Sequence, residues 1–315
     1  MIRSEICDIL GIRYPLFQGG MAWISEAILA AAVSNAGGLG IIAAGNADAD
    51  YVRAQVRKCK QLTDKPFGVN VMLLSPFVDE VAKVICEEKV AVVTTGAGLP
   101  GKWIKGWMAA GAKVIPVVPS IAIAKRVVRD GATAVIAEGT ESGGHVGELT
   151  TMALVPQIVD AVDVPVLAAG GIADGRGVAA SFMLGAKGVQ VGTRFLCAEE
   201  CQIHQHYKDK VLKAREIETV VTGRRLGHPV RALKNAFTQS LSQAEYNTLI
   251  SNEELEQMGV GTLRKSAVDG DLDGGSFLAG QVASMVKKIE SAQDIVIDLM
   301  TDAERRLSEA AQWVK

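Results

Sequence analysis

The chain has 315 residues and a mass of 33.2 kDa, which suits one large domain with an insertion, or two domains. Its formal net charge is −2 with a pI near 6.1, so the bulk charge does not favour a nucleic-acid partner. Hydrophobic residues make up 49% of the chain but aromatic residues only 5%, so the core must depend on Val, Ile, Leu and Ala.

The five cysteines are odd in number and contain no C-x-x-C pair, so we expect free thiols in a reducing cytosol. The first eight residues lack the apolar segment of a signal peptide. The most apolar region, residues 28–44, is interrupted by Ser34, Asn35 and a Gly-Gly pair, which indicates a helix, a turn and a strand. We therefore expect a cytoplasmic protein without a membrane segment.

Eight short apolar runs alternate with segments of helical periodicity, and their starts lie roughly 20 to 30 residues apart, the length of a βα unit. The runs are Pro15–Gln18, Leu39–Ala43, Phe67–Val71, Ala91–Thr95, Lys113–Val118, Thr133–Ala137, Val164–Ala169 and Gly188–Val191. An open doubly wound sheet also alternates strands and helices, but the count of eight favours a (β/α)8 TIM barrel. In such a barrel the functional site lies on the loops that follow the strands.

After Cys201 the pattern changes. We predict that residues 205–284 form a small, mostly helical cap inserted near the C-terminus, with a polar helix over residues 242–258. Residues 1–204 and 285–315 are predicted to form the barrel. Sequence patterns place the boundary between the cap and the barrel only to within several residues, because turn-rich segments flank it.

The sixth apolar run leads into a glycine-rich polar loop that carries His145 between Gly144 and Val146. Histidine titrates near neutrality, and flanking glycines let the backbone approach a ligand closely. We therefore expect catalysis at this loop. The alternative is that His145 only orders the backbone of its loop.

A glycine pair, Gly170-Gly171, follows the seventh run, and Gly192-Thr193 follows the eighth. Barrel enzymes often bind phosphate at these two loops, next to a helix N-terminus. Glycines also suit tight turns, but the coincidence of two such loops favours phosphate binding.

Three other motifs are weak. Residues 96–101 fit G-x-G-x-x-G but lack the acidic residue that a dinucleotide fold places about 20 positions later. Cys201, His204 and His206 have no evident fourth ligand, and the acidic loop that starts at Asp269 has Gly280 where a calcium loop needs Glu. No metal site is predicted.

Several motifs together resemble the flavin-dependent barrel group that holds nitronate monooxygenases and FMN-type enoyl-acyl carrier protein reductases. They are Phe17–Trp23, Asn35–Ile41, Lys65–Asn70, Glu138–His145, Ala168–Asp174 and Gln190–Arg194. The segments Leu73–Phe77, Val93–Ala97, Pro116–Ser120 and Gly227–Lys234 look like the reductase branch. Glu138 also favours that branch, because monooxygenases tend to have Gln there.

The resemblance implies an FMN cofactor, NADH or NADPH as reductant, and His145 as the catalytic residue. The implied flavin contacts are Gly20, Met21, Ala22, Asn70, Glu138, Gly143, Gly144, Gly170, Gly171, Gln190, Val191, Gly192 and Thr193. The implied activity is reduction of enoyl-acyl carrier protein in fatty-acid elongation. The alternatives are a nitronate monooxygenase and a flavin-free binding protein on a barrel scaffold.

Residues 204–234 carry eight Lys and Arg against three acids, an excess of five positive charges in an otherwise acidic chain. Acyl carrier protein is strongly acidic, so this stretch could dock it electrostatically, the alternative being a solvated helix face. The predicted docking residues are Lys208, Lys213, Arg224, Arg225 and Arg231. We expect a homodimer, with no nucleic-acid or membrane partner.

Overall fold

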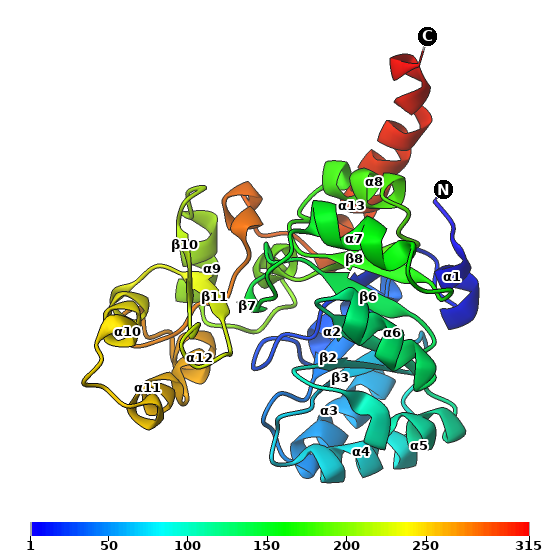
Figure 1. Ribbon diagram of the computed structural model, residues 1–315. Coiled ribbons are helices and arrows are strands. Elements are labelled where there is room, and N and C mark those ends of the chain that lie inside the picture. Colours follow the sequence, from blue (N-terminus) through cyan, green and yellow to red (C-terminus); the bar gives the residue numbers. More distant parts are fainter. Residues whose placement is uncertain (1, 315) are drawn as a thin grey trace.

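The computed structural model describes residues 2–314 and contains a ring of eight parallel strands, in the order β1-β9-β8-β6-β5-β4-β3-β2 (Figure 1). Each predicted strand is present and displaced by at most two residues, which confirms the (β/α)8 TIM barrel. The strands are β1 (Leu16–Gln18), β2 (Gly40–Ala43), β3 (Phe67–Met72), β4 (Val92–Gly96), β5 (Lys113–Val118), β6 (Val135–Glu138), β8 (Val166–Ala169) and β9 (Gly188–Val191).

The ring closes between β1 and β2 through one bridge, Phe17 to Leu39. Leu39 N donates to Leu16 O at 2.8 Å, and Gln18 N donates to Leu39 O at 2.9 Å. Beyond this bridge the side-chain amide of Gln18 continues the pairing. Its Oε1 accepts from Ile41 N at 3.2 Å, and its Nε2 donates to Ile41 O at 3.3 Å. A side chain therefore makes the bonds that a neighbouring peptide group would make.

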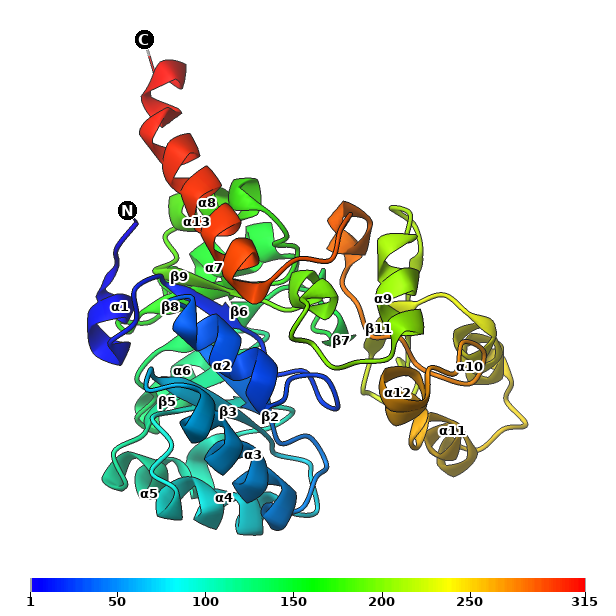
Figure 2. The same ribbon diagram turned by 180° about the vertical axis from the view of Figure 1, so that it is seen from behind.

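Helices cover the outside of the barrel. They are α2 (Ala27–Asn35), α3 (Ala49–Leu62), α4 (Val78–Glu87), η1 (Pro100–Lys102), α5 (Ile104–Ala109), α6 (Ile121–Arg129), α7 (Thr151–Val159) and α8 (Gly175–Met183). After β9 and the short η2 (Thr193–Cys197), the chain leaves the barrel. It returns as α13 (Ala292–Ser308), which packs between α8 and α2 (Figure 2), and ends in η5 (Ala310–Trp313). The eighth covering helix is thus supplied from beyond the cap.

Two apolar layers hold the barrel together. One fills its interior and includes Phe17, Ile41 and Ile136. Ile6 and Leu10 of α1 (Glu5–Leu10) also belong to it, and α1 closes the end of the barrel that lies opposite the carboxyl ends of the strands. The larger layer lies between the strands and the helices. Within residues 2–314, no helix has the length and apolarity that crossing a bilayer requires.

The segment 205–284, which we call the cap, forms a lobe beside the barrel (Figure 1). Its elements are α9 (Gln205–Leu212), β10 (Thr219–Thr222), β11 (Val230–Leu233), α10 (Ala236–Tyr246), α11 (Asn252–Gly259), α12 (Thr262–Arg264), a π-helical turn η3 (Lys265–Asp269) and η4 (Gln281–Met285). The prediction of one helix over 242–258 is wrong. Ser251 and Glu254 form a capping box that starts a second helix there. Strands β10 and β11 were not predicted.

The tightest contact between helix and sheet lies at Gly40, where α2 crosses β2. A Cβ at Gly40 would overlap the backbone of Ala30. We expect Gly40→Ala to lower the free energy of unfolding by about 1–3 kcal/mol, because backbone cannot move aside as a flexible side chain can. Gly106→Ala is the matched control: its Cβ would meet nothing within 4 Å. Since alanine is the better helix former, that variant should match or exceed wild-type stability in denaturant titration. Equal loss in both variants would contradict the close approach.

Candidate active site

One wall of the barrel mouth is a row of three residues on neighbouring strands. Glu138 pairs with Ala169, and Ala169 pairs with Gln190. Paired residues face the same side of a sheet, and Ala169 belongs to the interior layer, so all three face inward. Two strand spacings put the Glu138 and Gln190 backbones about 10 Å apart. The small Ala169 therefore leaves room for a ligand between two polar side chains.

The opposite wall is built by Gly20, Asn70 and Thr94. Thr94 Oγ1 donates to Asn70 Oδ1 at 2.9 Å, which leaves the Asn70 amide nitrogen available to a ligand. Gly20 lies so close that a Cβ there would collide with Asn70. Sequence analysis did not predict Thr94 as a site residue. Its position opposite Asn70 on the next strand is the signal that could have found it.

Glu138 ends β6 in a half-buried position. Burial raises its pKa to about 7, and the nearby Ser142 hydroxyl lowers it only in part. That hydroxyl is itself buried and has no hydrogen bond of good geometry. Buried polar groups are normally paired, so Ser142 is a donor that a ligand could satisfy.

His145 lies in the two-residue strand β7 (Gly144–His145), which pairs antiparallel with β11 of the cap. His145 faces Val230, and Val146 N donates to Pro229 O at 3.0 Å. The loop that follows β6 is thus joined to both lobes. The imidazole is exposed at the rim, yet the protein around it and the charge of His228 lower its pKa below 6.5. At pH 7 the ring is therefore mainly neutral.

The two glycine loops come together at the same end of the barrel. Gly170 and Gly171 have φ values of 90° and 75°, which favour glycine, and Gly192 lies against Met21. Asp174 caps α8 by accepting from the backbone nitrogens of Arg176 and Gly177. A phosphate would therefore meet the loop amides rather than the first turn of α8.

Other predicted flavin contacts lie around this mouth. Gly143 approaches the last segment of the cap, since a Cβ at Gly143 would be 2.6 Å from the Ala279 carbonyl carbon. Thr193 Oγ1 accepts from Gly280 N at 2.9 Å. Val191 differs, because its side chain packs in the layer between strands and helices and only its backbone could serve a ligand.

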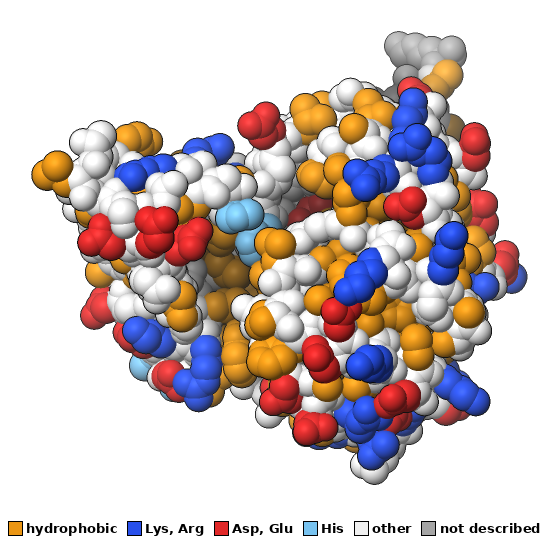
Figure 3. Space-filling model, turned by 60° about the horizontal axis from the view of Figure 1, so that its bottom comes forward, with side chains coloured by type: hydrophobic (Ala, Val, Ile, Leu, Met, Phe, Trp, Pro, Cys, Tyr) orange, Lys and Arg blue, Asp and Glu red, His pale blue; other side chains and the backbone are white. Residues whose placement is uncertain are grey.

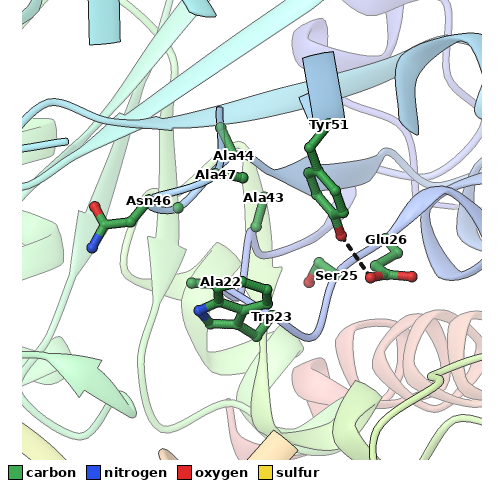
Figure 4. A pocket seen from close by; sticks show the side chains of 10 residues that line it. Ala22, Trp23, Ser25, Glu26, Ala43, Ala44, Asn46, Ala47 and Tyr51 are labelled. Atoms are coloured by element: carbon green, nitrogen blue, oxygen red, sulfur yellow. Dashed lines mark hydrogen bonds between the residues drawn. The ribbon is translucent and has the colours of Figure 1, made fainter. Parts of the chain in front are cut away.

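A small cavity lies behind the loop after β1, between Ala22, Trp23 and the residues that follow β2 (Figure 4). Tyr51 donates to Glu26 Oε1 at 2.6 Å in its wall, and Trp23 has a positive φ of 61°. Its volume of about 10 Å³ is near the minimum for one water molecule, so the cavity cannot hold a flavin.

A larger hollow separates the cap from the barrel. Figure 3 shows hydrophobic side chains in its wall and histidines at its edge. Another open hollow, of about 550 Å³, is lined by residues such as Glu199, Lys288 and Asp298 and contains none of the predicted site residues. The pairing of β7 with β11 joins the His145 loop to the cap, so the candidate site adjoins the hollow between the cap and the barrel.

The structure corrects two of the five predicted docking residues. Lys208 and Arg231 are buried, with exposed fractions of 6% and 7%. Lys208 Nζ donates to Ala198 O at 2.7 Å. Neither side chain can contact a partner protein, because each satisfies backbone carbonyls inside the chain. Lys213, Arg224 and Arg225 are exposed.

The weak metal motif has structural roles instead. His204 accepts from His206 N at 3.1 Å at the start of α9, and His206 Nδ1 hydrogen-bonds Gly270 O at 2.9 Å. Within residues 2–314 no group of three or more His, Cys, Asp or Glu side chains is arranged to hold a metal ion.

The residues at the mouth fit a flavin. A planar ring would lie between the Asn70 and Glu138 walls, where Gly20 and Ala169 leave space. The unpartnered Ser142 hydroxyl and the free Asn70 amide supply hydrogen bonds. The glycine loops of Gly171 and Gly192 supply backbone N–H groups for a phosphate.

The sequence profile of the nitronate monooxygenase family matches residues 3–85 and 74–302. The solved structure of FabK from Thermotoga maritima is 47% identical, with a TM-score of 0.97 over 100% of both chains. A curated relative in Mycobacterium tuberculosis, named (3aS,4S,5R,7aS)-5-hydroxy-7a-methyl-1-oxo-octahydro-1H-indene-4-carboxyl-CoA dehydrogenase, is 33% identical over 100% of this chain and 99% of its own.

A probable nitronate monooxygenase of Staphylococcus saprophyticus is 32% identical over 92% of this chain and 95% of its own. These three proteins match between 92% and 100% of this chain but carry different names. The profile match covers nearly the whole chain, and the chain belongs to the nitronate monooxygenase family of oxidoreductases.

Proposed function

We propose that this protein reduces trans-2-enoyl-acyl carrier protein with NADH or NADPH, using FMN. The observation that carries the proposal is the position of His145 on β7, the strand that pairs with β11 of the cap at the barrel mouth. Hydrophobic side chains line the hollow between the cap and the barrel (Figure 3), and apolar walls suit the acyl chain of a thioester. The 47% identity to FabK supports the same choice.

The chain's own residues would act as follows. Asn70, Glu138 and Gln190 orient the flavin ring, and the loops at Gly171 and Gly192 hold its phosphate. The bound flavin would supply hydride transfer from the pyridine nucleotide to the substrate. Neutral His145 would donate an N–H hydrogen bond to the thioester carbonyl oxygen, where negative charge develops as the β-carbon accepts hydride. A proton from His145 or from water would then be added at the α-carbon to complete the reduction.

A second candidate is the oxygen-dependent oxidation of alkyl nitronates. The family profile and the Staphylococcus relative favour it. In that reaction His145 would contact the nitronate anion, so the residue alone does not separate the two activities.

Anaerobic mixing with pyridine nucleotide separates them. We expect NADH or NADPH to bleach the absorbance near 450 nm that is typical of flavins, and crotonyl thioester to restore it. A nitronate monooxygenase would be reduced poorly and would consume oxygen with an alkyl nitronate. A colourless protein that binds no flavin would exclude both enzyme activities.

His145→Ala should keep the flavin but lose about 10²- to 10⁴-fold in turnover, the range for removing a group that acts on a developing charge or proton. Flavin content is read from absorbance and turnover from thioester reduction. Undiminished turnover in the variant would remove His145 from the mechanism.

The pH profile is the second measurement for the same role. The lowered pKa of His145 means that the ring gains its proton only below 6.5. If the neutral ring is active, wild-type turnover should be level near pH 7 and fall as the pH drops through the lowered pKa of His145. His145→Ala should lack this acid limb. A rate that instead falls as the pH rises through the same pKa would identify the imidazolium as the active form.

The exposed Arg224 tests carrier docking. We expect Arg224→Glu to raise KM for carrier-bound substrate and to leave KM for a coenzyme A thioester close to wild type. Lys125→Glu, the same charge change on exposed α6, is the control. We prefer Arg224 to Arg225, because Arg225 also donates to Asn247 O and Ile250 O. Equal loss on both substrates would count against docking at Arg224.

A further inference from the structure

Arg231 is a buried arginine whose contacts join the cap to the loop that carries His145. It lies on β11 and is 7% exposed. Its Nε and Nη2 both donate to Thr140 O, at 3.2 and 3.0 Å, and its Nη1 donates to Thr219 Oγ1 on β10 at 3.0 Å. The guanidinium thus ties a barrel loop to two cap strands.

The backbone repeats the same connection. Arg231 pairs with Gly144, and its neighbour Val230 pairs with His145. The strand that carries the guanidinium is therefore the strand that sets the register of the histidine. Because the side chains of a strand alternate between its two faces, a shift of the β7–β11 pairing by one residue would turn the imidazole to the opposite face.

Helix α7 of the barrel and the end of the cap anchor a different part of this loop. Thr151 N and Thr151 Oγ1 donate to the Glu141 carboxylate, and Gln281 N donates to Glu141 O at 2.9 Å. Thr140 O faces the cap and accepts both of its bonds from Arg231. Without them this carbonyl would lose two charge-assisted hydrogen bonds, which are stronger than neutral ones.

We propose that Arg231 is a positioning residue for His145, and that the β10–β11 hairpin is the element through which the cap holds the imidazole over the barrel mouth. The inference rests on the proposed role of His145. Arg231 is buried and donates to Thr140 and Thr219, so it would act through His145 rather than on a ligand. Its loss should therefore slow the step that needs His145 and spare flavin binding and flavin reduction by pyridine nucleotide.

The test compares Arg231→Met with Arg215→Met, a cap arginine that is not one of the predicted docking residues. In both arginines Nε and Nη2 donate to one oxygen atom, but the acceptor of Arg215 is the Glu218 carboxylate, within the cap. Flavin content, the anaerobic rate of flavin bleaching, and the rate at which enoyl thioester restores the colour are measured for each. Arg231→Met should slow only the last rate, by about 10²-fold, the loss expected from a misplacement of about 1 Å. Arg215→Met should stay near wild type in all three.

A double mutant separates positioning from general damage. In a His145→Ala background, Arg231→Met should cause no further loss, because the group that it positions is already gone. A further loss of similar size would show that Arg231 acts elsewhere and would overturn the proposal. If Arg231→Met does not fold, Arg231→Lys replaces it in the test. The lysine ammonium keeps a positively charged donor, so the rate at which enoyl thioester restores the colour should fall less, and this loss should also disappear in the His145→Ala background.

The outcomes for the two proposals differ. Full turnover in His145→Ala would overturn the proposed function, and the positioning role with it. Loss in His145→Ala, with Arg231→Met indistinguishable from Arg215→Met, would overturn the positioning role alone.

Discussion

Closure of the strand ring between β1 and β2 is the constraint on which the rest of the structure depends. The backbone supplies one bridge there, and the Gln18 amide supplies the next pair of bonds through Ile41. The same amide donates to Ser25 Oγ at 2.8 Å, and Ser25 Oγ accepts from Met21 N at 3.0 Å. The network that closes the barrel therefore also fixes the loop that would face the flavin.

The mouth of this barrel combines small residues with a few polar side chains. Gly20 and Ala169 create space, while Asn70, Glu138 and Gln190 offer hydrogen bonds from three sides. Burial makes the Glu138 carboxyl titrate near neutrality and keeps His145 mainly neutral. A site of this kind presents polar groups without a strong fixed charge, which suits a cofactor whose own charge changes during its cycle.

The cap contributes structural elements to the candidate site. It contributes two strands, β10 and β11, to a sheet whose third strand carries His145, and it contributes the buried Arg231. The last segment of the cap also passes Gly143 and Thr193 before the chain supplies α13, the last helix of the barrel wall. The site therefore depends on chain segments that lie about a hundred residues apart, and the cap and barrel hold it jointly.

The sequence by itself determined the eight-strand barrel, because each strand is a local apolar run and its position follows from period and spacing. It also placed His145 and the two glycine loops at the strand ends, since parallel strands end at one edge. Only the tertiary structure decided which polar groups are free. Lys208 and Arg231 look like surface charge in sequence but are buried donors, and Thr94 is identified by its bond to Asn70. Such roles come from contacts between residues far apart in the chain, which local periodicity does not encode.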